Sequence, residues 1–372
     1  MNFLIVTHVL HSAAQKQYYA YAPYVREMNI WLKYADKCTI VAAVTDKEPT
    51  AIDIAYKHPT IVFQKVPLMA LTSLKNSLKI IIQIPYVMYV IAKAMQQADH
   101  IHLRCPGNIG LLACIVQFFF PFKTKTAKYA GNWDFKSKQP WSYRLQKWIL
   151  NNAFLTRNMK VLVYGEWENQ SRNIKSFFTA TYTESEKVTN TKQALDSGLE
   201  FIFVGSVVSG KNPMYAVQLI EQFIKKGKKA TLNIYGEGVE KAVLEKYIKE
   251  NQLGNHIVLH GNQNQEILKK AYQKSHFVIL ASKSEGWPKA VAEGMFWGCV
   301  PLATAVSCVP DMLDYGNRGI LLEMDLDKDI AVISALINNS MDFEKKSIAA
   351  ANWSRNYTLD RFENEIQKLL AK

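Results

Sequence analysis

Short apolar runs of strand type alternate with helical patterns along the 372 residues of this chain. In the first half the runs are FLIV (3–6), CTIVAAV (38–44), TIVFQKV (60–66), HIHLR (100–104), TAKYAG (126–131) and KVLVYG (160–165). The second half repeats the pattern with FIFVG (201–205), TLNIYG (231–236), IVLHG (257–261), HFVIL (276–280) and VPLAT (300–304). Strands that alternate with helices form parallel sheets, so the sequence predicts an α/β fold with a sheet in each half.

The length of the chain indicates two domains, because it exceeds what one simple core needs. The segment from Thr179 to Gly198 is polar, and we expect the linker there. The predicted N-terminal domain covers residues 1–185 and the C-terminal domain covers 186–355. The tail, residues 356–372, contains an amphipathic helix pattern. Ligands bind at the carboxyl ends of such strands, which predicts a site in a cleft between the domains.

Composition argues against several classes of protein. Five cysteines, an odd number without a CxxC pair, argue against a disulfide framework or a zinc site, and the histidines lack the spacing of metal ligands. We therefore expect no metal and a reducing cytoplasm. The N-terminus lacks a cationic region and a cleavage site, so it is predicted to be a strand rather than a signal peptide. Two apolar stretches, 80–94 and 109–122, are shorter than the ~20 residues of a membrane-spanning helix and predict packed helices, with partial exposure of one of them to lipid as the alternative.

Positive charge is concentrated in the first half of the chain. Residues 1–183 contain 22 lysines and arginines against 9 acids, whereas the remainder contains 23 of each. Basic residues between 123 and 160 are interleaved with Trp133, Trp141, Tyr143 and Trp148. Such a surface suits an anionic membrane leaflet, with the protein peripheral at its inner face, or a phosphate-bearing acceptor. A generally basic surface is an equal alternative, and nucleic acid is disfavoured because no recognised binding motif accompanies the charge.

The segment ASKSEGWPKAVAEGMFWGCVPLAT (281–304) sets two carboxylates, Glu285 and Glu293, around a predicted helix start. Pro288 suits a first helical turn. Free N–H groups at a helix N-terminus bind a diphosphate, and carboxylates accept hydrogen bonds from sugar hydroxyls, so the segment has the outline of a nucleotide-sugar site. Acids near a helix start also stabilise the helix dipole, which is the alternative for either residue alone.

This segment resembles the signature of GT-B retaining glycosyltransferases of the GT4-like (group 1) family. The resemblance implies two Rossmann-like domains with parallel sheets facing across a cleft, and a C-terminal helix that crosses back to the first domain. It also implies that Glu285 contacts the donor sugar, that Glu293 contacts the ribose, and that Lys211 is the phosphate cation after Gly205. The donor-binding residues expected from it are Gly205, Ser206, Lys211, Glu285, Gly286, Trp287, Pro288, Lys289, Ala290 and Glu293.

The chain departs from the family pattern at several places. Ser206 stands where the family often has an arginine, and Ser307 and Cys308 replace a pair of glycines. In the first domain, the strand TAKYA precedes Gly131-Asn132-Trp133-Asp134, where relatives often have a histidine. The turn Tyr235–Gly238 is of the expected kind, but its glycines require only a tight turn.

The acceptor is expected in the first domain. Asn132 and Asp134 are candidates to bind acceptor hydroxyls, and Trp133 is a candidate to stack on a sugar; the alternative is a strand-end turn with a buried tryptophan. Arg104 is a candidate to hold a phosphate or carboxylate, and a structural salt bridge is its alternative. His11 is chosen over His8 for acceptor contact at the carboxyl end of the first strand.

The expected function is transfer of a hexose-type sugar, with retention, from a nucleoside diphosphate sugar to a hydroxyl of a sugar or lipid-linked acceptor in cell-surface polysaccharide or glycolipid synthesis. Glu285 and Lys211 are the expected catalytic residues, with no cofactor beyond the donor substrate. A nucleotide-sugar epimerase of the same fold and a nucleotide-sugar-binding protein without turnover are the alternatives. A Rossmann dehydrogenase is disfavoured because no GxGxxG follows the first strand.

Overall fold

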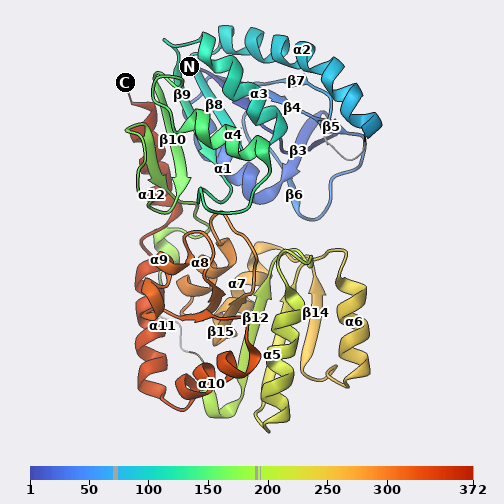
Figure 1. The fold of residues 1–372 in the computed structure, drawn as a ribbon, viewed down its shortest axis with the longest axis vertical. Helices are drawn as coiled ribbons and strands as arrows, with labels where there is room; N and C mark the ends of the chain where they lie inside the picture. The colour runs from blue at the N-terminus through green and yellow to red at the C-terminus, as the bar shows by residue number, and fades with distance from the viewer. Residues whose placement is uncertain (70–73, 189–191, 193, 372) are drawn as a thin grey trace. The chain divides into compact units, whose positions relative to one another are not determined.

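A computed structural model of the chain describes residues 1–69, 74–188, 192 and 194–371. It divides into two compact units (Figure 1). Unit 1 consists of Met1–Phe178 and Glu363–Lys372, and unit 2 consists of Thr179–Phe362. Each unit is an α/β structure built on a parallel sheet, which confirms the predicted fold class. Among the helices of the described ranges, none is long and apolar enough to cross a membrane.

Unit 1 contains a seven-stranded sheet whose neighbouring strands all pair in parallel. Its strand order is β11 (Ile174–Phe177), β10 (Met159–Tyr164), β9 (Thr124–Tyr129), β8 (His100–Cys105), β1 (Asn2–Val6), β4 (Lys37–Ala42) and β7 (Ile61–Lys65). Six of these strands were predicted from apolar runs, and β11 was not. The interiors of the central strands are buried because helices cover both faces, which is why their runs are continuously apolar.

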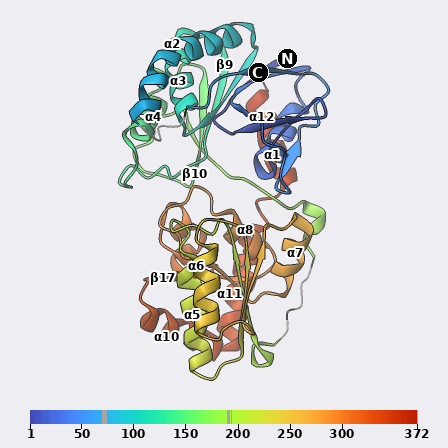
Figure 2. The same cartoon turned by 90° about the vertical axis from the view of Figure 1, so that its right-hand side faces the viewer.

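Helices cover the two faces of this sheet unequally. One face carries α2 (Leu74–Gln97), α3 (Asn108–Val116) and α4 (Trp141–Leu150), and the other carries α1 (Ala22–Leu32) and α12 (Leu359–Leu370) (Figures 1 and 2). The two apolar stretches of the sequence correspond to α2 and to α3 with the following 3-10 turn, Gln117–Phe119. The C-terminal part of α12 is held in unit 1 by Glu363, which accepts hydrogen bonds from Lys33 and Tyr34 at 2.5 and 2.8 Å.

A second, four-stranded sheet in unit 1 lies outside the sequence prediction. Its order is β5 (Val44–Thr45), β2 (His11–Ala14), β3 (Gln17–Tyr21) and β6 (Asp53–Ala55). Strands β2 and β3 form an antiparallel hairpin whose turn residues, Gln15 and Lys16, both have positive φ. Neither is a glycine or asparagine, so the usual sequence signal of such a turn is missing.

Unit 2 contains a six-stranded parallel sheet with the order β14 (Ile257–Gly261), β13 (Ala230–Tyr235), β12 (Leu199–Val204), β15 (Phe277–Leu280), β16 (Val300–Thr304) and β17 (Ile320–Leu322). The five strands predicted from the sequence are present, and β17 is additional. The helices are α5 (Pro213–Lys225), α6 (Lys241–Glu250), α7 (Gln265–Lys274), α8 (Lys289–Phe296), α9 (Val309–Met312), α10 (Leu326–Ile337) and α11 (Ser340–Ser354). Helix α8 packs on β15 and β16, and α11 packs on α8.

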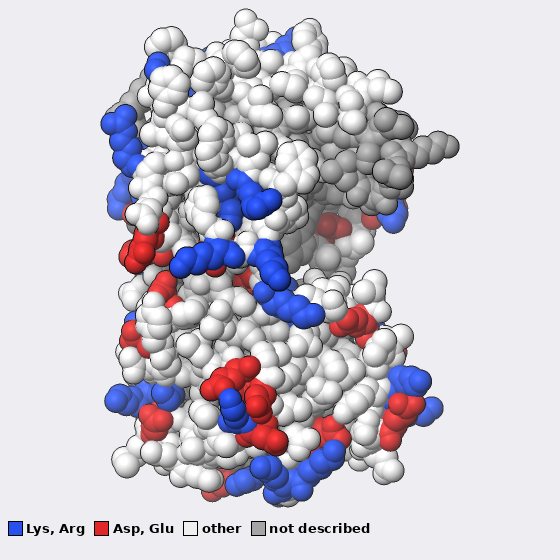
Figure 3. All heavy atoms as spheres, in the orientation of Figure 1, with Lys and Arg blue, Asp and Glu red and all other residues white. Residues whose placement is uncertain are grey.

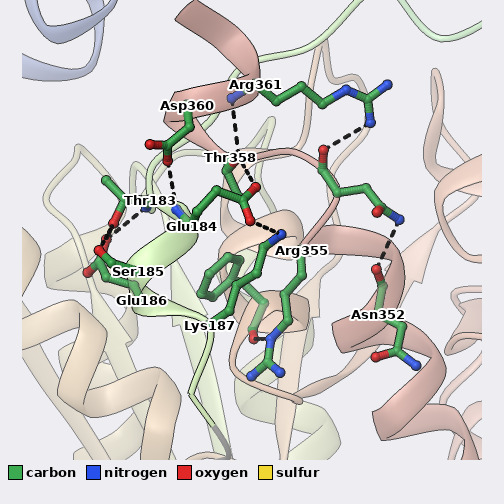
Figure 4. A network of polar contacts seen from close by, with 12 residues as sticks. Thr183, Glu184, Ser185, Glu186, Lys187, Asn352, Arg355, Thr358, Asp360 and Arg361 are labelled. Carbon is green, nitrogen blue, oxygen red and sulfur yellow. Dashed lines mark hydrogen bonds and ion pairs between the residues drawn. The ribbon is translucent and has the colours of Figure 1, made fainter. Parts of the chain in front are cut away.

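The segments through which the chain enters and leaves unit 2 are tied to each other (Figure 4). The Glu184 carboxylate accepts a hydrogen bond from the Thr358 hydroxyl at 2.6 Å, and the Glu184 backbone N–H donates to Asp360 at 2.7 Å. Arg355 donates to the carbonyl of Val188 at 2.7 Å. These bonds fix both ends of unit 2 at one place on its own surface.

Candidate functional site

The sheet of unit 2 has a topological switch point between β12 and β15. From the central strand β12 the chain proceeds to β13 and β14 on one side, and then crosses over to β15, β16 and β17 on the other side. The loops that follow β12 and β15 therefore leave the sheet toward helices on opposite faces. In open α/β sheets, ligands bind outside the carboxyl ends of the strands at this place.

Two residues predicted as catalytic meet at the switch point. Lys211 lies in the β12–α5 loop, Glu285 lies in the β15–α8 loop, and the Lys211 Nζ is 2.5 Å from Glu285 Oε1. The Glu285 side chain is 7% exposed and that of Lys211 is 31% exposed. The two loops also join through their backbones, since Lys283 N–H donates to the Gly210 carbonyl at 2.9 Å. A buried carboxylate thus holds a lysine whose ammonium group still reaches solvent.

Helix α8 begins immediately beside Glu285. It spans Lys289–Phe296, so Pro288 is the N-cap residue and not part of the first helical turn. No side chain caps this N-terminus. The Lys211 ammonium group pairs with Glu285, which lies just before α8, so it is close to the positive end of the α8 dipole. Both groups favour the binding of an anion.

Glu293 lies on α8 and contacts a different set of residues. Its carboxylate accepts hydrogen bonds from the Thr181 hydroxyl at 2.7 Å and from the Tyr272 hydroxyl at 3.2 Å. It borders a small pocket of unit 2 lined by Thr179, Ala180, Thr181, Tyr182, Lys289, Ala292, Glu293, Phe296, Ser354 and Tyr357. The structure thus joins Glu285 to Lys211 and joins Glu293 to the segment that enters unit 2. The ribose contact of Glu293 remains a prediction.

The loops after β12 and β13 pack backbone against backbone, which the sequence did not indicate. Val207 N–H donates to the Glu237 carbonyl at 2.9 Å. A Cβ at Gly236 would lie 1.9 Å from the Gly205 carbonyl oxygen, and one at Gly238 would lie 2.2 Å from that of Val207. These glycines therefore do more than allow a tight turn: they set the position of the loop that carries Lys211.

The remaining predicted donor residues surround this point. Ser206 is exposed in the β12–α5 loop, and Ala290 lies in the first turn of α8. The Gly286 carbonyl accepts a hydrogen bond from the Ser307 hydroxyl at 3.1 Å, which attaches the β16–α9 loop to the β15–α8 loop. Trp287 stacks on Trp353 of α11 with ring centroids 6.0 Å apart, so its ring anchors the loop to the body of unit 2.

In unit 1, several acceptor candidates are buried. His11 is not in a loop after β1 but in β2, is fully buried, and contacts the Val9 carbonyl and the Tyr56 hydroxyl at 2.8 and 2.7 Å. Burial lowers the pKa of His11 to about 4. Trp133 is also fully buried, with its ring edge-to-face against Tyr129 at 5.0 Å. Neither ring presents a surface to an acceptor. Trp133 is instead the buried tryptophan of a turn at the end of a strand, which was its alternative interpretation.

The polar neighbours of Trp133 stabilise the turn around it. The Asn132 side-chain oxygen accepts a hydrogen bond from Asp134 N–H at 2.9 Å, and the Asp134 carboxylate accepts one from Lys136 N–H at 2.8 Å. Asn132 is buried and Asp134 is half-buried. Asn132 and Asp134 could contact acceptor hydroxyls only if these hydrogen bonds within the turn were shared with the acceptor or broken.

Arg104 forms a buried ion pair within the protein, which was the alternative to its binding a phosphate or carboxylate of a ligand. Its guanidinium is 2.9 Å from Glu27, and the ammonium group of Lys128 is 3.0 Å from the same carboxylate. Burial alone would raise the pKa of Glu27, but the charges of Arg104 and Lys128 outweigh it and lower that pKa to about 2. Arg104 is therefore committed to Glu27 within unit 1.

The Glu27 cluster predicts a specific acid sensitivity. Because its pKa is lowered on folding, Glu27 stabilises the fold above the unfolded pKa of 4.5, and this contribution is lost as pH falls from about 4.5 toward about 2. The lowered pKa corresponds to about 3 kcal/mol. We expect Glu27→Gln to be destabilised at neutral pH and to lose less stability than the parent between these pH values. Denaturant unfolding at a series of pH values measures both effects. If the unfolding free energy of the two proteins depended equally on pH, the lowered pKa of Glu27 would be contradicted.

His8, rather than the predicted His11, lies at a position open to a ligand. It follows β1 at the switch point of the unit 1 sheet, where β1 lies next to β8, and it is exposed. A Cβ at Gly107, in the loop after β8, would lie 2.7 Å from the His8 side chain. Partial desolvation and the charge of Arg104 lower the pKa of His8, so a neutral ring faces solvent at the carboxyl end of the strands.

The described residues contain no group of three or more histidine, cysteine, aspartate and glutamate side chains that could hold a metal ion. The acidic run at the start of α10 stabilises that helix instead. Asp325 accepts hydrogen bonds from the backbone N–H groups of Asp327 and Lys328, and Asp329 accepts from those of Glu323 and Met324.

Known proteins share this architecture over nearly the whole chain. Sucrose-phosphate synthase from Thermosynechococcus elongatus matches with a TM-score of 0.70 and 14% identity, covering 99% of this chain and 98% of that one. Anabaena HepE in complex with UDP and glucose matches with a TM-score of 0.70 and 13% identity, with the same coverage. A mutant of S. aureus TarM, solved with UDP, matches less of the chain: the TM-score is 0.58 at 17% identity, covering 78% of this chain and 59% of that one. These structures define the fold as GT-B.

The sequence of unit 2 is similar to a known family. Residues 186–356, which include Lys211, Glu285 and Glu293, match the family model for glycosyl transferases group 1. An uncharacterized glycosyltransferase of Methanocaldococcus jannaschii is 27% identical over 139 residues, which span 37% of this chain and 38% of that relative. This match includes the segment at 281–304, whose signature indicated the same family.

Proposed function

We propose that this protein is a retaining glycosyltransferase that transfers a hexose-type sugar from a nucleoside diphosphate sugar to an acceptor hydroxyl. The observation that carries the proposal is the pairing of Lys211 with Glu285 at the β12/β15 switch point, beside the N-terminus of α8. The match of residues 186–356 to the family model for glycosyl transferases group 1 supports it, as do the UDP and UDP-glucose complexes of HepE, which has the same fold.

The chemistry follows from the charges at this point. Breaking the bond between the sugar and the diphosphate leaves negative charge on the departing phosphate. The Lys211 ammonium group and the free N–H groups of α8 would stabilise that charge, an effect that grows in a site where water is excluded. Glu285 would accept a hydrogen bond from a donor sugar hydroxyl and keeps Lys211 in place before the donor binds. Retention rests on the family resemblance and requires no covalent nucleophile here.

A thermal-shift screen against UDP-, GDP- and ADP-sugars tests donor binding, followed by assay of the responding donor with sugar and lipid-linked acceptors. NMR of the product then shows whether the anomeric configuration of the donor is kept. We expect stabilisation by at least one nucleotide sugar and a product with retained configuration. Inversion would contradict the proposed mechanism, and conversion of the donor without any acceptor would indicate an epimerase.

Ser206 favours one second candidate, a nucleotide-sugar-binding protein without turnover, because the β12–α5 loop lacks the arginine that the family often has at this position.

The same residue gives a prediction for the proposed enzyme. Ser206 is exposed, so Ser206→Arg should fold normally and add a charge-assisted contact to the diphosphate, with about tenfold tighter binding of the responding nucleoside diphosphate. Titration calorimetry measures it, with Ser209→Arg, exposed in the same loop, as the matched control. Equal tightening by both variants would reveal a general charge effect.

A further inference from the structure

Exposed aromatic side chains are concentrated on one part of unit 1. Among the residues that the structure describes, every exposed phenylalanine and tryptophan lies between residues 118 and 154. Phe122 is 91% exposed and Phe119 is 71% exposed. Burial of a phenylalanine is strongly favourable, so a cluster of exposed ones marks a surface that another apolar phase covers.

These residues join further exposed apolar side chains on α2. The α2–α4 face, as we call it, includes Ile82, Tyr86 and Tyr89 of α2, Phe118, Phe119 and Phe122 after α3, and Trp148 of α4. Helix α3 packs against both α2 and α4, so the three helices form one layer on one face of the sheet. Figures 1 and 2 show this layer on the side of the sheet opposite α1 and α12.

The charge around this face has one sign. Residues 61–165 contain 14 lysines and arginines and only two acids, Asp99 and Asp134. Lys93, Arg144 and Arg157 are among the exposed cations. Arg157 lies over the ring of exposed Phe154 at 4.8 Å, so cation and aromatic groups share the same surface. In Figure 3, unit 1 presents a wide surface without charged side chains, with lysine and arginine side chains at its left and lower edges.

The charge distinguishes two possible partners of this face, a second copy of the chain and an anionic bilayer. A symmetric dimer would place the face against its own copy, and a surface with cations and almost no acids is not complementary to itself. An anionic bilayer supplies the opposite charge and an apolar phase. Tryptophan, tyrosine, lysine and arginine side chains also suit a membrane interface, because each combines an apolar part with a polar end.

We propose that the α2–α4 face docks on an anionic lipid surface, with its aromatic side chains inserted at the level of the headgroups and its cations on the lipid phosphates. This attachment concerns unit 1 and is independent of the nucleotide site proposed in unit 2. It would restrict the enzyme to acceptors near a membrane, the lipid-linked ones in particular.

Co-sedimentation of the full chain with vesicles tests this docking. We expect binding to phosphatidylcholine vesicles that contain phosphatidylglycerol and much weaker binding to pure phosphatidylcholine. Substitution of Lys93, Arg144 and Arg157 by glutamine should weaken binding about fivefold per cation, on the order of a hundredfold in total. Substitution of Phe118, Phe119 and Phe122 by serine should weaken it by at least about tenfold.

Matched triple variants in unit 2 serve as controls. For the charge change these are Lys226→Gln, Lys228→Gln and Lys229→Gln, and for the apolar change Val243→Ser, Val332→Ser and Met341→Ser. All of these side chains are exposed, so every variant should unfold at nearly the parent temperature. In the parent, brominated lipid should quench tryptophan fluorescence, and Trp148→Phe should reduce the quenching.

Three outcomes would overturn the proposal. The first is a parent that does not sediment with anionic vesicles. The second is binding that the face variants and the unit 2 controls weaken equally, which would indicate net charge alone. The third is a dimer in solution that the phenylalanine substitutions dissociate while the parent shows no lipid binding, which would assign the face to a second copy of the chain.

Discussion

Lys211→Ala is expected to lower the rate of sugar transfer by about 10²- to 10³-fold, because it removes a preorganised cation from the position where negative charge develops. It should also weaken donor binding, since the ammonium group is partly exposed and positioned to meet the diphosphate before reaction. The fold should persist, because a single ion pair is lost and the Lys211 side chain is partly exposed. Initial rates of nucleotide release with saturating acceptor measure the effect.

Lys283→Ala is the matched control for this result. Lys283 lies two residues before Glu285, is exposed, and joins the two loops through its backbone N–H, which the substitution leaves in place. We expect rates close to those of the parent. If Lys211→Ala is as active as Lys283→Ala, the ammonium group of Lys211 does not act on the leaving group and the assignment is wrong.

Gly236→Ala is expected to have the largest effect on stability. The added methyl group would lie 1.9 Å from the Gly205 carbonyl oxygen, and Gly236 has a φ of 146°, which side chains disfavour. A backbone atom cannot yield as the end of a flexible side chain does, so we expect a loss of about 3 kcal/mol in the free energy of unfolding. The β12–α5 loop should be displaced as well, with a large loss of donor binding.

Gly254→Ala provides the comparison, because a Cβ at Gly254 would meet nothing within 4 Å. Its unfolding free energy should change by less than about 1 kcal/mol. Denaturant unfolding and nucleotide titration of both variants measure stability and binding separately. A Gly236→Ala protein as stable as Gly254→Ala would show that the loops after β12 and β13 are not in backbone contact.

The sequence predicted the sheets well because their central strands are buried on both sides and are therefore continuously apolar. It missed β11, a short strand at the edge of its sheet, for which no apolar run stands out in Ile174–Phe177. It also missed the β2–β3 hairpin, since a turn through Gln15 and Lys16 carries no glycine or asparagine. That omission placed His11 in a loop, whereas the structure buries it in β2.

The candidate site was predictable where it depends on local sequence. The residues around Glu285 carry the pattern of a loop that leads into a helix, and the sheet order then brings Lys211 to it across 74 positions. Contacts between distant segments were not predictable. The hydrogen bond from Thr181 to Glu293 and the approach of Gly236 to Gly205 depend on tertiary packing, which spacing along the chain does not encode.

The structure of the protein crystallised with the nucleoside diphosphate that stabilises it most would test the central claim most directly. We predict density for the diphosphate at the β12/β15 switch point, within hydrogen-bonding distance of Lys211 Nζ and of the backbone N–H groups that open α8. Density for the diphosphate elsewhere, with Lys211 still paired only to Glu285, would contradict the account.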